Sequence, residues 1–523
     1  MRRVYAIIVF LILIVCYGYF TPRWGDWNAN SRADLVYALG DLGVLHIDDY
    51  HQNTGDKACF PGPYDIESDT CQGHYYTDKS LGPSLVALPF YMVFKGIAQI
   101  PPVQRFINSD NLPGNFTSTL DPEGRGIQTE SVYQGLALTF ITFFAMSLPS
   151  ALLGTVVFLF AARFTDRLIN AAILALAFGL ATIAFPYSNT LTQHQLAAFG
   201  TFVGWYLLWR VIYENASQRW LWIVGLLFGL VAITEYPTVV IAGPIFLWAV
   251  YVYPRRIALY RVIVGAIPVG LIFAAYNLSI FGTPLPVGYE YSTLWQDVHT
   301  AGFLSFTSPT LERYYGLLFS PVKGLFLLSP FLLLVVPGLI LMWKRLPARR
   351  SATVLPALIN IGYITLYASS TMWWGGYTVG PRYLVPLIPF MALPVIFAFD
   401  YLLARRWGII TTCVLLLASV AHVWGLSIAG QDWPPTDILP LTFETMNASF
   451  PIVDYALPLL AQGDIARNYG GLILNLNGFA GLIPLLLALT LIVLIVPAAT
   501  LRLASASKTR PAGGEPEQQT VHP

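Results

Sequence analysis

Apolar stretches recur along most of this chain, and they constrain its fold more than any other feature of the sequence. Each is about 20 residues long, which as a helix is enough to cross the hydrocarbon core of a bilayer. The composition agrees, because 56% of the residues are hydrophobic and only 11% are charged, against about 25% charged in soluble proteins. We therefore predict an all-α integral membrane protein, since a helix satisfies its own backbone polar groups in lipid.

Hydropathy predicts about twelve membrane-spanning helices. The first occupies residues 1–20, and because no small-residue cleavage site follows it, we interpret it as an uncleaved span. The last, 478–500, precedes a polar segment at 501–523 that we expect to be a disordered cytoplasmic tail. The bundle between them is expected at 134–427, with spans near 134–162, 168–185, 196–213, 220–234, 238–253, 261–280, 324–343, 353–370, 384–400 and 408–427.

Basic residues between the spans predict which side of the membrane each loop faces. The turns at 255–256, 344–350 and 405–406 are rich in arginine, and they fall on the cytoplasmic side if the amino terminus is cytoplasmic. A further apolar stretch at 81–99 is long enough to cross, but a crossing there would turn all three outward. We therefore expect 81–99 to be re-entrant or to lie at the membrane interface.

Two large outer segments result, at 21–133 and 428–477, and the first holds two cysteines. Cys59 and Cys71 are twelve positions apart in a polar insert, so we predict a disulfide between them in an oxidising compartment. A metal site is the alternative, but the close CxxC and histidine spacing that zinc prefers is missing.

The outer loop also concentrates charged groups against the bilayer. Residues 24–43 predict an amphipathic surface helix, with Leu35, Leu39 and Leu42 on its apolar face and Arg32, Asp34 and Asp41 elsewhere. Beyond it come two Asp-Lys pairs, and carboxylates can take a proton while ammonium groups can hold a phosphate. A solvated loop with charges for solubility is the plainer interpretation. The pairs are Asp56-Lys57 and Asp78-Lys79.

Other outer turns place polar and aromatic residues on the same side. His194 and Glu235 each stand at the end of a span, and ionisable groups at membrane depth are costly. Tyr289 belongs to an aromatic turn at the rim, and Trp374 precedes a glycine-rich segment that ends in Arg382. An arginine at the start of a span can grip a phosphate bidentately, or it can be an anchor to lipid headgroups.

At these residues the chain resembles the polytopic GT-C glycosyltransferases, which include protein O-mannosyltransferases and the aminoarabinose transferases of lipid A. The resemblance covers roughly residues 1–400. It rests on the acidic amphipathic outer loop after the first span, on YYTDKSLGPSLVALPFY, which is similar to the family's Tyr-x-x-Lys-Pro-Pro stretch, and on GPRYLVPLIPF. The chain departs from the family at Asn30-Ser31, where an acidic pair usually opens the first amphipathic helix.

The resemblance implies that a sugar leaves a polyprenyl-phosphate donor at the outer face and is received by a hydroxyl of a lipid, glycan or protein. Lys79 would contact the donor phosphate, with Arg382 and Lys57 as further candidates. Because of the departure at Asn30-Ser31, the catalytic base must be another loop carboxylate, and we rank Asp56 first, then Asp48 and Asp34. The expected substrate pocket contains His74, Tyr76, Asp78, His194, Glu235, Tyr289 and Trp374.

No cofactor is predicted with certainty. A divalent metal is possible, and Asp48-Asp49 could serve one, but Asp-rich turns are usually solvated, so no metal ligand is assigned. Nucleic acid is not expected as a partner because the net charge is only +1. Two other functions stay open: a transporter or flippase of an amphipathic, lipid-linked substrate, and an inactive GT-C-like binding protein. The site is expected to face the periplasm or exterior of a cell membrane.

Overall fold

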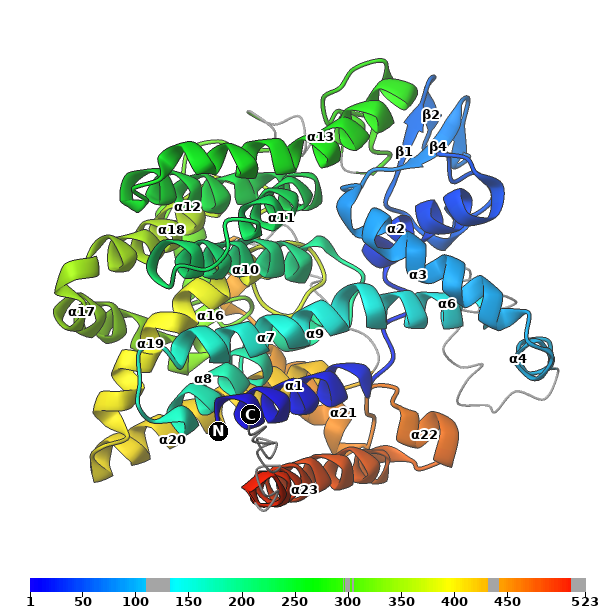
Figure 1. Ribbon diagram of the computed structural model, residues 1–523. Helices are drawn as coiled ribbons and strands as arrows, with labels where there is room; N and C mark the ends of the chain where they lie inside the picture. Colours follow the sequence, from blue (N-terminus) through cyan, green and yellow to red (C-terminus); the bar gives the residue numbers. More distant parts are fainter. Residues whose placement is uncertain (110–131, 295, 297–301, 303–304, 431–441, 509–523) are drawn as a thin grey trace, which may run out of the picture.

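Parallel and antiparallel helices packed side by side make up most of the structure (Figure 1). The computed structural model describes residues 1–109, 132–294, 296, 302, 305–430 and 442–508. The long helices and their bounds are α1 (Arg2–Gly18), α6 (Val132–Thr142), α7 (Leu148–Ala161), α8 (Leu168–Leu180), α10 (Gln193–Tyr213), α11 (Trp220–Thr234), α12 (Val239–Val252), α13 (Tyr260–Phe281), α17 (Val335–Arg345), α18 (Ser351–Ala368), α19 (Ile388–Leu402), α20 (Arg406–Ile428) and α23 (Ile483–Lys508).

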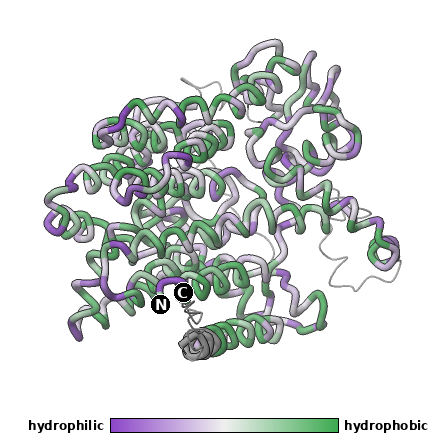
Figure 2. Tube along the Cα trace, in the orientation of Figure 1, coloured by the Kyte–Doolittle hydropathy of each residue, from purple (hydrophilic) through white to green (hydrophobic). Residues whose placement is uncertain are grey.

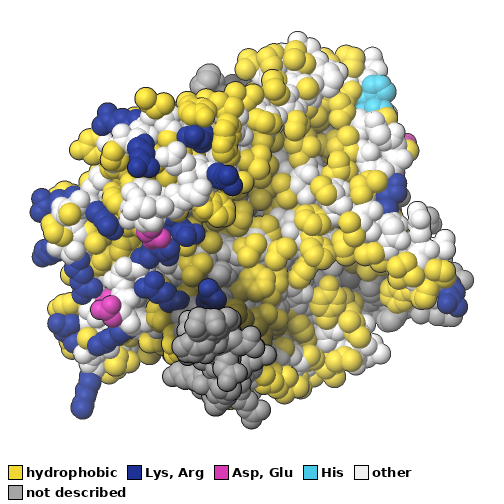
Figure 3. Space-filling view, in the orientation of Figure 1, with side chains coloured by type: hydrophobic (Ala, Val, Ile, Leu, Met, Phe, Trp, Pro, Cys, Tyr) yellow, Lys and Arg dark blue, Asp and Glu magenta, His cyan; other side chains and the backbone are white. Residues whose placement is uncertain are grey.

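Several of these helices suit a membrane environment. Within the described residues, seven helices are long and apolar enough to cross a bilayer, or eight if one bent pair counts as a single span. Hydrophobic residues dominate the helices along their length (Figure 2), and most Lys and Arg side chains on the visible face gather at one end of the bundle (Figure 3). This distribution agrees with a mostly helical membrane protein.

The bent pair is formed by the apolar stretch at 81–99. Helix α3 (Gly82–Ala98) meets α4 (Pro101–Ile107) at an angle of 97°, as in a broken span or a re-entrant loop. Pro101 and Pro102 stand in the first turn of α4 and cannot donate backbone hydrogen bonds that would continue α3. Near this bend, Lys95 Nζ lies 2.9 Å from Asp41 Oδ1, which ties α3 to the turn that follows α2.

Two of the predicted spans differ from simple helices. The span expected at 134–162 is one continuous helix over Val132–Ala161, which passes Pro149 through a π-helical turn at Phe143–Ser147. The span expected at 324–343 is divided into α16 (Leu325–Leu328), a 3₁₀ turn at Pro330–Leu334 and α17. Pro330 explains this division, because it has no N–H to continue the ladder from α16.

The polar outer loop contains short strands that hydropathy did not predict. Strands β1 (Lys57–Phe60) and β4 (His74–Thr77) pair antiparallel, from Lys57 opposite Thr77 to Phe60 opposite His74. Between them, β2 (Tyr64–Asp65) pairs with β3 (Thr70–Cys71). A disulfide joins Cys59 to Cys71, with their Cα atoms 5.7 Å apart. Strands of two to four residues carry too little periodic signal to be found in the sequence.

The helix α2 (Trp27–Tyr37) in the same loop corrects a sequence prediction. Arg32 and Asp34, placed away from the apolar face, are fully buried, whereas Leu42, assigned to that face, is 50% exposed. The amphipathic surface helix is therefore wrong in its sidedness. The physical reason is that α3, β4 and the 3₁₀ turn at His51–Asn53 all pack against α2, so that it is covered on several sides.

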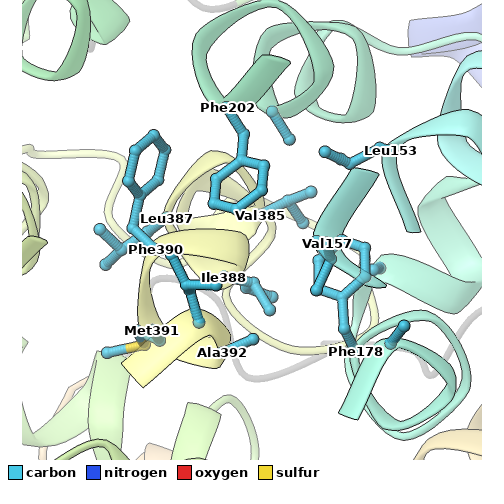
Figure 4. Close-up of a cluster of buried hydrophobic side chains, with 14 of the residues drawn as sticks. Leu153, Val157, Phe178, Phe202, Val385, Leu387, Ile388, Phe390, Met391 and Ala392 are labelled. Atoms are coloured by element: carbon cyan, nitrogen blue, oxygen red, sulfur yellow. The ribbon is translucent and has the colours of Figure 1, made fainter. Parts of the chain in front are cut away.

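The centre of the bundle lies where α7, α8, α10 and α19 meet. Leu153, Val157, Phe178, Phe202 and Phe390 interdigitate there (Figure 4), and all are fully buried or nearly so. In the most apolar part of Arg382–Leu402, which contains α19, 89% of the residues are buried, against 11% in that of Gly478–Pro497, which includes the start of α23. Helix α19 is therefore central and α23 peripheral, although both are apolar. Helix α23 continues to Lys508, past the predicted tail boundary, and residues 509–523 lie outside the described residues.

Helices α11 and α13 pack with their backbones in close contact. Gly225 and Gly229, four positions apart on α11, face Val262 and Ala266 of α13. A Cβ added to Gly225 would lie 2.2 Å from the carbonyl oxygen of Val262. Small residues at this spacing are a common means of helix association in membranes, because they let backbones approach.

We expect Gly225→Ala to destabilise the protein by about 1–3 kcal/mol, because the added methyl group overpacks the α11–α13 contact. The matched control is Gly243→Ala in α12, where an added Cβ meets no atom within 4 Å. Thermal unfolding of both variants in detergent checks the expectation. Equal midpoints for the two variants would show that the close contact does not limit stability.

Candidate functional site

A lysine between two carboxylates forms the centre of the candidate site. Lys79 Nζ lies 3.1 Å from Asp56 Oδ2 and 3.0 Å from Asp78 Oδ1. The strand pairing explains this meeting, because Asp56 directly precedes β1, while Asp78 and Lys79 directly follow β4. Since Lys57 is paired with Thr77, the residues just beyond the pair come together at the same end of the hairpin.

A third segment secures the hairpin from the side of α13. Ser292 follows a 3₁₀ turn at Gly288–Tyr291, and its hydroxyl donates a 2.9 Å hydrogen bond to Asp78 Oδ2. The backbone N–H of Thr293 donates to the carbonyl oxygen of Lys57 at 2.9 Å. These bonds fix the turn that carries Tyr289 against the Asp56–Asp78–Lys79 cluster.

The electrostatics of the cluster keep the lysine charged. Burial by itself would lower the pKa of Lys79, but the nearby Asp56 and Asp78 carboxylates outweigh burial and raise that pKa above its ordinary value. Burial raises the pKa of Asp78, and the attraction of Lys79 opposes that rise. A lysine that stays cationic in a shielded position is suited to hold an anionic ligand.

Arg32 is a second buried cation close to this cluster. Its Nη1 donates to the Asn28 carbonyl at 2.7 Å and its Nη2 donates to the side chain of Gln193, while its Nε has no hydrogen-bond partner within the described part of the chain. Burial lowers the pKa of its guanidinium, and the charges of Asp56 and Asp78 act against that effect. Arg32 thus links α2 to the start of α10.

Asn30 and Ser31, where the resemblance leads one to expect acidic residues, have structural hydrogen bonds. Asn30 Nδ2 donates to the carbonyl oxygens of Trp24 and Asn53 at 2.8 and 3.0 Å. The Ser31 and Thr77 hydroxyls share a hydrogen bond of 2.7 Å. Both side chains therefore help to hold α2 against β4 and the neighbouring loop.

His194 and Glu235 form a buried pair at the ends of α10 and α11. His194 Nδ1 lies 3.1 Å from Glu235 Oε2. The hydroxyls of Tyr363 and Tyr367 donate to Glu235 Oε1 at 3.2 and 3.1 Å. Glu235 thereby connects α10, α11 and α18 at the end of the bundle nearest the hairpin.

Arg382 occupies the start of the segment that leads into α19. Its guanidinium lies 5.2 Å from the centre of the Tyr383 ring, and among the described residues it has no carboxylate within ion-pair distance. Its Nε is buried and has no hydrogen-bond partner in the same part of the chain. Buried Lys323 fixes the preceding loop, because its Nζ donates to the carbonyl oxygens of Gly376 and Thr378, both at 2.8 Å.

A cavity of about 390 Å³ lies beside these charged groups, within the range typical of small-molecule sites. Its wall is mostly apolar and aromatic, with Gln193 and Glu235 among its few polar members. It shares Tyr236, Pro286 and Tyr289 with a smaller cavity that Asp78 and Lys79 line. The lysine cluster and the apolar cavity are therefore neighbours, separated by the Tyr289 turn.

The structure brings together some of the residues singled out in the sequence and separates others. Asp56, Asp78 and Lys79 meet directly, while Tyr289 and Glu235 line the adjoining cavity. His194 contacts Glu235, and its ring centre lies 5.7 Å from that of Tyr383, the residue next to Arg382. The others have separate surroundings: Asp34 with Asn53, Lys57 with Asp69, Tyr76 with Phe281, Trp374 with Trp373, and Asp48 with His74.

Three residues of the site were not predicted to belong to it. Arg32 was assigned to an exposed helix face, although its spacing of four from Asn28 permits the hydrogen bond within α2. Gln193 and Lys323 carry no local signal, because their partners lie far along the chain.

No family model matches this chain, and no curated protein is significantly similar to it. The function therefore has to be inferred from the chemistry of the site.

Asp34 provides a test that separates a structural carboxyl from a catalytic one. Burial raises the pKa of Asp34 well above 3.8, and Asn53 Nδ2 donates to its Oδ1 at 3.0 Å. Protonated Asp34 contributes its whole stabilisation at pH values below the pKa that this residue has in the unfolded chain. As the pH rises from that pKa to the higher pKa in the folded protein, the free energy of unfolding falls by about 1.4 kcal/mol per pH unit.

We expect Asp34→Asn to remove this loss, because an amide does not ionise. The variant should become more stable than the parent as the pH rises above about 4, the pKa of an aspartate in the unfolded chain. The exposed Asp49→Asn is the control and should leave the pH dependence unchanged. Thermal midpoints between pH 4 and 8 are the measurement. Parallel curves for parent and Asp34→Asn would contradict the buried, protonated state.

Proposed function

We propose that this chain is a multi-pass membrane glycosyltransferase of the GT-C type, which moves a sugar from a polyprenyl-phosphate donor to a hydroxyl group at the outer face. The observation that carries the proposal is the Asp56–Lys79–Asp78 cluster next to an apolar cavity of about 390 Å³. The cluster offers a base and a cation, and the cavity offers room for part of an amphipathic donor. The acceptor is a lipid, a glycan or a protein.

In the proposed reaction, Asp56 takes the proton of the acceptor hydroxyl. The oxygen of that hydroxyl then bonds to the anomeric carbon of the sugar. The bond between that carbon and the phosphate oxygen breaks, and the electron pair leaves with the phosphate, where Lys79 stabilises the charge. Because Lys79 lies 3.1 Å from Asp56, the donor phosphate and the acceptor hydroxyl would be held at the same cluster.

Other groups fit the donor in this proposal. Arg382 has a buried Nε with no partner in the described chain, so a phosphate oxygen is a suitable acceptor for it. Val239, on the wall of the cavity, is 57% exposed, so the cavity reaches the side of the bundle that we propose faces lipid. The prenyl chain would enter along that side. Asp78 would position Lys79, since the Ser292 hydroxyl and Lys79 both contact it.

The proposed topology has about twelve spans, with both termini cytoplasmic and the hairpin outside. The basic end of the bundle in Figure 3 then faces the cytoplasm, as the positive-inside rule requires. The disulfide between Cys59 and Cys71 suits the oxidising outer side. The spans would be α1, the joined α6 and α7, α8, α10, α11, α12, α13, α17, α18, α19, α20 and α23.

We expect Asp56→Asn and Lys79→Met each to lower sugar transfer by about 10²-fold or more, because each removes a group that acts on the reacting atoms. The assay measures sugar release from a panel of labelled polyprenyl-phosphate sugars by the full-length protein in lipid nanodiscs. Lys57→Met is the matched control, since Lys57 Nζ pairs with Asp69 at 3.0 Å and not with the cluster.

Activity of Asp56→Asn equal to that of the parent would exclude Asp56 as the base. Binding of the donors without release by the parent protein would favour the inactive binding protein. Movement of an intact lipid-linked sugar between leaflets, again without release, would favour the flippase.

The orientation has its own test. We expect a membrane-impermeant maleimide to label Glu290→Cys in intact cells and Ser217→Cys only after the membrane is opened, because both residues are exposed at opposite ends of the bundle. Labelling of the parent protein serves as the control for Cys413, which is exposed along α20. The reverse pattern would place the lysine cluster on the cytoplasmic side and end the proposed topology.

A further inference from the structure

Two histidines and an aspartate meet on the outer loop, apart from the lysine cluster. His46, Asp48 and His74 each present one atom that can bind a metal, and the three atoms lie within 4.8 Å of one another. Asp48 Oδ2 is 3.1 Å from His46 Nδ1 and 2.6 Å from His74 Nδ1. The two imidazole rings are stacked, with their centres 4.6 Å apart. Histidine also shows in Figure 3, at the end of the molecule opposite most of the Lys and Arg side chains.

Hydrogen bonding alone does not account for this arrangement. His46 Nδ1 is buried, and within the described residues it has no hydrogen bond, although it is close to Asp48 Oδ2. Asp48 Oδ2 thus faces the Nδ1 atoms of both histidines, but only His74 Nδ1 has the geometry of a hydrogen bond to it. A metal ion would satisfy all three atoms. In a tetrahedral zinc site with bonds of about 2.0–2.2 Å, neighbouring ligand atoms are about 3.3 Å apart.

The surrounding backbone already orients the aspartate. Asp48 Oδ1 accepts a 2.7 Å hydrogen bond from the backbone N–H of Tyr75, so that the other carboxylate oxygen, Oδ2, points toward the histidines. The N–H of Ile47 donates to the carbonyl oxygen of Tyr75 at 2.7 Å, which places residues 46–48 alongside β4. Hydrogen bonds that orient a ligating carboxylate are a regular feature of metal sites, because they reduce the freedom lost on binding.

We propose that His46, Asp48 and His74 form a binding site for Zn²⁺, with solvent as the fourth ligand. Two imidazoles and one carboxylate are a donor set that zinc accepts readily. None of the three residues contacts Lys79, so the proposal does not depend on the transfer reaction. The ion would join residues 46–48 to the first residue of β4, the strand that leads directly into Asp78 and Lys79.

The test uses the full-length protein in detergent, treated with a chelator and then titrated with Zn²⁺. We expect one zinc per chain by elemental analysis, and a higher thermal midpoint with zinc than without it. His46→Ala and His74→Asn should each weaken zinc binding at least tenfold. His422→Gln is the matched control, because His422 lies on α20 and its Nδ1 contacts the Ala418 carbonyl oxygen at 2.8 Å, away from the cluster, and its zinc affinity should equal that of the parent.

Two further measurements keep the outcome clear. The fraction of protein with an intact Cys59–Cys71 disulfide shows whether each variant has folded, and Co²⁺ in place of Zn²⁺ should give the visible absorption of a tetrahedral site. A folded parent protein that binds no zinc would overturn the proposal. Retention of stoichiometric zinc by the double variant His46→Ala and His74→Asn would overturn it equally.

Discussion

The ammonium group of Lys79 is largely withdrawn from water, and the outer part of the protein is arranged around that fact. Removing a charge from solvent costs several kcal/mol, and the cost is recovered only when partners of opposite charge are well placed. Asp56 and Asp78 provide that placement, and both depend on the pairing of β1 with β4. A shift of one residue in this register would move Asp56 away from the lysine. The register, the disulfide at Cys59 and Cys71 and the hydrogen bond from Ser292 all fix the same arrangement.

The helical bundle and the loop after α1 differ in the interactions that hold them together. In lipid a helix satisfies its own backbone, so the bundle can be almost wholly apolar, as its centre around Phe202 and Phe390 is. The polar groups of the candidate site gather at the ends of α10 and α11 and in the loop after α1, where Arg32 of α2 bonds to Gln193 beside His194 and Glu235. Lys323 also lies at this end of the bundle, where its Nζ donates hydrogen bonds to the carbonyl and hydroxyl oxygens of Thr378.

The helical class and the presence of several helices long and apolar enough to cross a membrane could be predicted from the sequence, because both depend on local hydropathy. The meeting of Asp56 with Lys79 could not, because it depends on a strand register over a few residues. The burial of Arg32 and Asp34 was missed for a related reason: a helix pattern shows which face is apolar, but not that α3 and β4 cover the other faces. The histidine cluster joins residues 28 positions apart in the sequence, from His46 to His74, so no motif spacing indicates it.

Helices α11 and α13 run in the same direction, and each ends next to the apolar cavity, at Glu235 and at the turn that carries Tyr289. The missing side chains of Gly225 and Gly229 let the two helix axes come close together near their middles. The separation of the two helix ends follows from that contact. Two absent methyl groups thus set how far apart the segments that carry Glu235 and Tyr289 lie.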